Sequence, residues 1–215
     1  MNRVNFYIDG FNLYYGLKSL KSQDGNFRRF YWIDFVKFFE HFIGENQSLQ
    51  KVYYFTATPL SDKKSNRQRL LFLANELING DRFEVIKGQF YEQQTICPVC
   101  NNIYIKPEEK RTDVNISVRM MGDCVLNRVD TLVLVCADSD LIPPLQFIKE
   151  HYPDKNIRVY FPPNGFSSAL TSFMKSCNKK VIHLGNSKIK LQNSIMSDAV
   201  SRDGITYVIP DKWKS

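Results

Sequence analysis

The chain has 215 residues, of which 43% are hydrophobic, so we expect one globular domain that buries roughly 70% of its unfolded surface. Lys and Arg number 29 against 22 acidic residues, and the net charge of +7 at pH 7 favours polyanionic partners. No window approaches the roughly 18 apolar residues of a membrane span, and the N-terminus lacks the apolar stretch of a signal peptide. The composition therefore predicts a cytoplasmic protein with no membrane partner.

Strand-like and helix-like patterns alternate along the chain. Strands are predicted at residues 4–8, 51–57, 82–88, 131–137, 157–161 and 180–184, and helices at 33–43, 64–79, 111–127, 142–151 and 166–177. This alternation is typical of βαβ units and predicts an α/β fold with a mainly parallel sheet. In the third helix, helical spacing predicts a core-facing stripe of Val114, Val118, Met121 and Val125. Asp123, on the opposite side of that helix, is expected to face solvent.

Two segments interrupt the alternation. Residues 89–110, QFYEQQTICPVCNNIYIKPEEK, form a long insertion, and insertions of this length are usually functional loops or appended hairpins. We assign residues 1–185 to one domain. Residues 186–215 are expected to form a C-terminal extension that packs on the domain or trails from it.

Aspartates follow two of the predicted strands and open one of the predicted helices. Asp9 follows the first strand directly, and Asp138 follows the strand at 131–137, with Asp140 two residues further on. Thr112 would cap the third helix and place Asp113 in its first turn, at the same carboxyl edge of the sheet. A turn or a helix cap explains each acid singly. Neither explains why three separate elements all place an Asp at the same edge. That arrangement favours a Mg²⁺ or Mn²⁺ site, because these ions prefer carboxylate ligands.

Polar and basic side chains near these acids have two interpretations each. The Asn12 amide either holds a carboxylate or a metal-bound water, or caps the helix that follows it. Four cations are candidate phosphate ligands or solvent-facing charges: Arg67, Arg69, Lys110 and Arg111. The lysine-rich run 175–190 has the same two interpretations. None of the three histidines flanks these acids, which argues against a histidine acid–base ribonuclease.

Five cysteines without an export signal predict reduced thiols and no disulfide framework. The motif CPVC places Cys97 and Cys100 at the spacing of a metal knuckle, but a structural Zn²⁺ ion needs two more ligands. Cys177 and His183 could supply them, or a second chain in a homodimer could. A plain reduced hairpin and a redox pair are the other interpretations.

The motifs FYIDGFNLYYGL, EKRTDVNISV and VLVCADSDLIPPLQFIKE, in this order, resemble those of bacterial NYN-domain (LabA-like) proteins of the PIN-like nuclease superfamily. The resemblance covers most of residues 3–185, and relatives can carry a similar cysteine-bearing insertion. It implies a PIN-like three-layer α/β/α sandwich and a metal-dependent endoribonuclease acting on RNA. The residues that match the family's acidic site are Asp9, Asn12, Asp113, Asp138 and Asp140.

Such a site holds Mg²⁺ or Mn²⁺ ions that activate water and neutralise charge on a phosphodiester. Relatives often carry an Asp six residues after the acid that matches Asp113, where this chain has Arg119. The site is therefore compatible with either one bound metal ion or two. That departure keeps a non-catalytic RNA-binding module as an alternative. A flap-type DNase is another, because phosphate contacts do not distinguish RNA from DNA.

Overall fold

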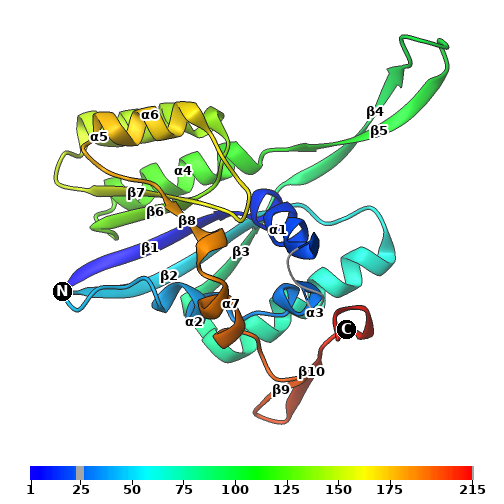
Figure 1. The fold of residues 1–215 in the computed structure, drawn as a ribbon, viewed down its shortest axis with the longest axis horizontal. Helices are drawn as coiled ribbons and strands as arrows, with labels where there is room; N and C mark the ends of the chain where they lie inside the picture. Colours follow the sequence, from blue (N-terminus) through cyan, green and yellow to red (C-terminus); the bar gives the residue numbers. More distant parts are fainter. Residues whose placement is uncertain (23–26, 215) are drawn as a thin grey trace.

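Six parallel strands form the centre of the molecule (Figure 1). The computed structural model describes residues 1–22 and 27–214. The strand order is β3-β2-β1-β6-β7-β8, with bounds β1 Asn2–Asp9, β2 Gln47–Thr56, β3 Phe83–Lys87, β6 Thr131–Val135, β7 Asn156–Phe161 and β8 Ile182–His183. β1 and β6 are adjacent, with Ile8 opposite Val135. Their carboxyl ends therefore lie side by side.

Helices cover both faces of this sheet, and a hydrophobic core lies on each face. Successive side chains along a strand point into opposite cores. On β1, Phe6 and Ile8 face a core shared with helices α1 (Gly10–Ser19), α2 (Phe35–Glu40), α3 (Asp62–Asn79) and α7 (Lys188–Asn193). Tyr7 faces the other core, shared with α4 (Thr112–Val125), α5 (Ile142–His151) and α6 (Ser168–Ser176). The predicted three-layer α/β/α sandwich is confirmed. Among the helices of the described residues, none is long and apolar enough to cross a membrane.

The insertion folds as a hairpin that extends away from the body (Figure 1). Its strands are β4 (Gln89–Ile96) and β5 (Ile103–Lys110), paired antiparallel over their whole length. At its base, a Cβ on Gly88 would lie 2.6 Å from the Lys110 carbonyl oxygen. The two strands therefore meet at a point with no room for a side chain.

The C-terminal segment contacts the first core. It contains a small hairpin, β9 (Ala199–Arg202) and β10 (Ile205–Val208). The indole of Trp32 donates to the Ser197 carbonyl at 2.9 Å, and the amide of Met196 donates to the Trp32 carbonyl at 3.0 Å. Trp213 is 8% exposed and lies against Tyr31 and Trp32.

The expected orientation of α4 is wrong. Val114, Val118 and Val125 are 64%, 60% and 63% exposed, whereas Asp123 is 1% exposed. The buried face consists of Thr112, Ile116, Met120, Asp123 and Cys124. Asp123 is tolerated in the core because Tyr7 Oη donates to its carboxylate at 2.8 Å and Asn5 Nδ2 donates at 3.2 Å.

Candidate active site

Asp9 lies at the junction of β1 and α1 and acts as the N-cap of α1. Its Oδ1 accepts hydrogen bonds from the amides of Phe11 and Asn12, both at 3.0 Å. Its Oδ2 accepts from Asn12 Nδ2 and from the Cys136 thiol at 3.3 Å. Burial raises the pKa of Asp9 above its ordinary value, although these four donors act in the opposite direction.

Gly10 allows the chain to turn from β1 into α1 at this point. A Cβ on Gly10 would lie 2.3 Å from the Tyr54 ring and 2.5 Å from the Phe55 carbonyl oxygen. Only glycine fits so close to β2. The DG pair therefore fixes where the Asp9 carboxylate emerges.

Asn12 and Cys136 connect the Asp9 junction to the loop after β6. Asn12 lies inside α1 and is not its cap, which corrects that interpretation; its Oδ1 accepts from the Ala137 amide at 3.1 Å. The Cys136 sulfur accepts from the Asp138 amide at 3.1 Å. Each of these side chains thus contacts Asp9 and the loop that carries Asp138.

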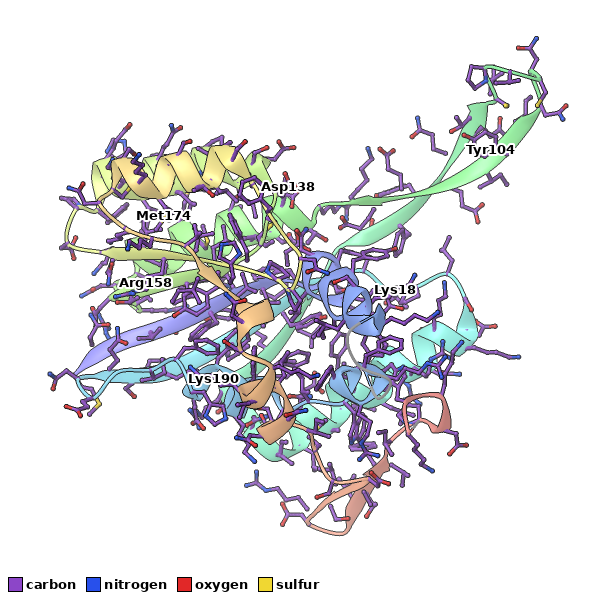
Figure 2. The ribbon with its side chains drawn as sticks, viewed as in Figure 1. Lys18, Tyr104, Asp138, Arg158, Met174 and Lys190 are labelled. Carbon is purple, nitrogen blue, oxygen red and sulfur yellow. The ribbon has the colours of Figure 1, made fainter. Side chains whose placement is uncertain are left out.

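Asp138 begins the short 3-10 helix Ser139–Leu141 and caps it. Its Oδ1 accepts from the Asp140 amide at 3.0 Å. Figure 2 shows Asp138 near the point where the β4–β5 hairpin leaves the body. Asp140 is exposed in the first turn of the same 3-10 helix.

Asp113 lies in the first turn of α4, as expected, but Thr112 is not the cap of this helix. The N-cap is Arg111, in a left-handed conformation with φ of 77°, and the Thr112 hydroxyl donates to Glu109 instead. Burial, followed by the negative charge of Asp9 and of three further acids, raises the pKa of Asp113 to about 6; those acids are Asp138, Glu109 and Asp140. Within residues 1–22 and 27–214, no hydrogen-bond donor reaches the Asp113 carboxylate.

The chemistry of this group suits a divalent cation. Carboxylate oxygens are the ligands that Mg²⁺ and Mn²⁺ prefer, and a cation would offset the repulsion at Asp113. The described residues contain no group of three acidic, His or Cys side chains already arranged around one position. Asp9 accepts four hydrogen bonds, which occupy its lone pairs. An ion at Asp9 would therefore displace a donor, of which the thiol is the weakest.

The four candidate phosphate ligands lie in two places. Lys110 pairs with Glu108 at 3.0 Å, and Arg111 donates to the Tyr91 hydroxyl at 2.9 Å, both at the base of the hairpin. Arg67 lies on α3. Burial raises the pKa of the Tyr14 phenol, and the positive charge of Arg67 partly offsets that rise. Arg69 is exposed on α3.

Two features that suggested alternative roles have structural partners. Arg119 contacts Glu84 on the edge strand β3 at 3.2 Å and lies 4.8 Å from the centre of the Tyr53 ring on β2. In the run 175–190, Lys190 donates to the His41 carbonyl and Lys179 donates to Asn156. These cations therefore contribute to packing.

Three kinds of residue around the acids were not predicted from the sequence. Glu109 acts electrostatically on Asp113, although it belongs to the insertion. Cys136 is buried, and its thiol contacts Asp9. Tyr14 and Tyr15 are 40% and 60% exposed on the helix that Asp9 caps, and two adjacent tyrosines in the helix that follows this aspartate were the available signal.

Comparisons with known proteins identify relatives of this chain. A sequence model of the NYN domain matches residues 3–185. The chain is similar to 6-hydroxy-3-succinoylpyridine 3-monooxygenase HspA of Pseudomonas putida, with 28% identity over 222 residues, 87% of this chain and 68% of that protein. It is also similar to the crystal structure of a Vibrio parahaemolyticus protein of unknown function, with a TM-score of 0.54 and 18% identity over 85% of this chain and 93% of that one. At that identity the likeness supports the fold alone.

Proposed function

Because this chain belongs to the NYN domain family, within the PIN-like nuclease superfamily, we propose that it is an endoribonuclease that uses Mg²⁺ or Mn²⁺ to hydrolyse RNA phosphodiester bonds. The observation that carries the proposal is Asp113. It is a partly buried carboxyl group with no donor from the described residues, facing four other acids. Such a group is expected where a cation binds.

The metal ions would supply a water of lowered pKa and positive charge opposite the phosphate. Asp113, Asp138 and Asp140 would hold them, together with one Asp9 oxygen released by the Cys136 thiol. Asn12 keeps the Asp9 carboxylate oriented through its amide and ties it to the loop after β6. The acids themselves need not act as nucleophiles.

The cations around the acidic edge support RNA as the polyanionic substrate. Arg111 and Lys110 lie at the base of the hairpin, beside the helix that carries Asp113. The charge of Arg67 influences the pKa of Tyr14, which lies on α1. A cation and an exposed aromatic ring therefore occur close together there. Cations contact phosphates and aromatic rings stack on unpaired bases, which suits a single strand.

The test is cleavage of end-labelled single-stranded RNA, and of flap DNA, in Mg²⁺, Mn²⁺ or EDTA. Asp138→Asn and Asp9→Asn should lower the cleavage rate by orders of magnitude, the scale on which metal activation of water operates. RNA affinity should change little, because cations supply it, and it should weaken steeply with salt. Asp203→Asn is the matched control, since this carboxylate is 86% exposed on the β9–β10 turn.

Three outcomes would decide against the proposal. Equal cleavage by the wild type and by Asp138→Asn would indicate a contaminating nuclease. RNA retained on a gel but left intact in both metals would favour the non-catalytic binding module. Cleavage of flap DNA in preference to RNA would favour the DNase.

The name of the Pseudomonas relative favours one further candidate, a monooxygenase acting on a hydroxylated pyridine. A monooxygenase inserts one oxygen atom of O₂ and reduces the other to water with two electrons from a donor. Oxygen uptake with 6-hydroxy-3-succinoylpyridine and a two-electron donor tests it directly. Uptake that depends on both compounds, in a protein that leaves RNA intact, would replace the nuclease assignment.

A further inference from the structure

The distal part of the β4–β5 hairpin takes no part in the proposed hydrolysis. We call residues 94–105 the hairpin tip. Figure 1 shows this segment projecting from the body, and Figure 2 shows Tyr104 on it, far from Asp138.

The CPVC motif forms a tight turn at the end of the hairpin tip. The Asn101 amide donates to the Cys97 carbonyl at 2.9 Å, and the Cys97 amide donates to the Asn102 carbonyl at 2.9 Å. Asn101, directly after the second cysteine, is left-handed with φ of 54°. Hydrogen bonding from the Cys100 amide, then from the Val99 amide and the Cys100 thiol, lowers the pKa of the Cys97 thiol. The turn therefore brings both sulfur atoms together at the end of the arm.

This arrangement is half of a tetrahedral zinc site. A structural Zn²⁺ ion takes four ligands, and its cysteine pairs commonly have this spacing. The other cysteines belong to the body: Cys124 and Cys136 are buried, and Cys177 follows α6. In the part of the chain that the structure describes, no third Cys or His completes a site.

The surface around the turn is apolar and uncharged. Ile96 lies opposite Ile103 in the β4–β5 register, and Ile105 follows on the same face. These side chains are 62%, 67% and 58% exposed, and Val99 in the turn is 91% exposed. No charged residue occurs between positions 94 and 105, although the chain carries a net charge of +7. Two copies can therefore approach tip to tip without charge repulsion.

We propose that two copies of this chain join at their hairpin tips around one Zn²⁺ ion, held by Cys97 and Cys100 of each copy. A two-fold axis through the ion makes the two pairs equivalent and places the isoleucine faces against each other. Each thiol that is protonated in the free chain releases its proton when it binds. No redox step is involved.

The test is the metal content and mass of the whole chain, purified under reducing conditions without a chelator. Elemental analysis should give one zinc per two chains, and light scattering should give a dimer. Cys97→Ser and Cys100→Ser should each lose the zinc and become monomeric. Cys177→Ser should retain both properties, because this residue lies in the body. The contact between two narrow hairpins is small, so a zinc chelator should also dissociate the wild-type dimer.

Misfolding is distinguishable from loss of the site. The hairpin tip does not belong to either core, so Cys97→Ser should keep the melting temperature of the body. Replacement of zinc by Co²⁺ should give the intense visible absorption of four-thiolate coordination. One zinc in a monomer, a zinc-free chain, a Cys97–Cys100 disulfide seen by mass, or a dimer that survives Cys97→Ser would each overturn the proposal. None of these outcomes bears on RNA cleavage.

Discussion

Asp113 is a poorly compensated charge at the carboxyl edge of the sheet. Its pKa of about 6 lies above the ordinary value, first because it is partly buried and then because Asp9, Asp138, Glu109 and Asp140 repel its charge. For an acid whose pKa is raised by folding, the folded state holds the proton more tightly than the unfolded state does. Stability is therefore lost as the pH rises from about 4 through about 6.

Asp113→Asn should consequently raise the melting temperature of the metal-free protein at pH 7.5. A gain of roughly 1–3 °C is the scale expected for a chain of this size when a partly solvated charge is removed. At pH 4.5 the wild-type carboxyl group is mostly protonated, and the difference should shrink. Thermal unfolding of both proteins at the two pH values, in EDTA, measures this. A mutant less stable than the wild type at pH 7.5 would mean that the carboxylate is compensated after all.

The same group predicts how metal binding depends on pH. Mn²⁺ must displace the proton of Asp113, so its affinity should rise between about pH 5 and pH 7 and then level off. Calorimetric titration across this range measures the affinity. In Asp113→Asn the residual affinity should be weaker and should lose most of this rise.

At the scale of a single element, α4 shows where sequence patterns failed. The valines at 114, 118 and 125 have helical spacing, but so does the face that is actually buried, Thr112, Ile116, Met120 and Asp123. A count of apolar residues predicts that the valine face is buried, because an aspartate on the other face lowers the predicted burial of that face. Only the tertiary partners of Asp123, which come from β1, make that face the core-facing one. The strands of the central sheet were easier to predict; β6, for example, is a short apolar run bounded by polar residues.

Substitutions on the two faces of α4 should therefore differ sharply. Ile116→Ala removes a fully buried side chain and should lower the free energy of unfolding by about 2–4 kcal/mol. Val118→Ala, on the exposed face, should change it by less than about 0.5 kcal/mol. Urea denaturation of the two variants compares them. The reverse order would restore the valine stripe as the buried face.

At the scale of the whole molecule, alternating strands and helices were enough to predict a mainly parallel sheet, and the resemblance to NYN-domain proteins added the three-layer sandwich. The contacts of the C-terminal segment were not predictable, because they depend on groups distant in sequence. Trp32 donates to Ser197, and Arg29 pairs with Asp198 at 2.6 Å. The thiol contact of Cys136 with Asp9 was missed for the same reason.

Trp213→Ala should test how much the C-terminal segment stabilises the body. The indole is buried against Tyr31 and Trp32, and its removal should cost about 3 kcal/mol of unfolding free energy. Ile205→Ala, at a side chain 49% exposed on β10, is the matched control and should have little effect. Chemical denaturation followed by tryptophan-independent circular dichroism gives both values. Equal effects would show that the segment adds little to the core.

The position of β1 between β2 and β6 has a consequence during biosynthesis. Cys136, which contacts Asp9, is synthesised 127 positions after it, and the β1–β6 pairing waits for that distant strand. Pairings of such long range form slowly and late. A growing chain, held against a ribosome rich in RNA, thus lacks an assembled acidic edge until β6 and the loop after it have been translated. Under the proposed function, the strand order itself delays RNA cleavage until the segment that carries Asp138 and Asp140 has left the ribosome.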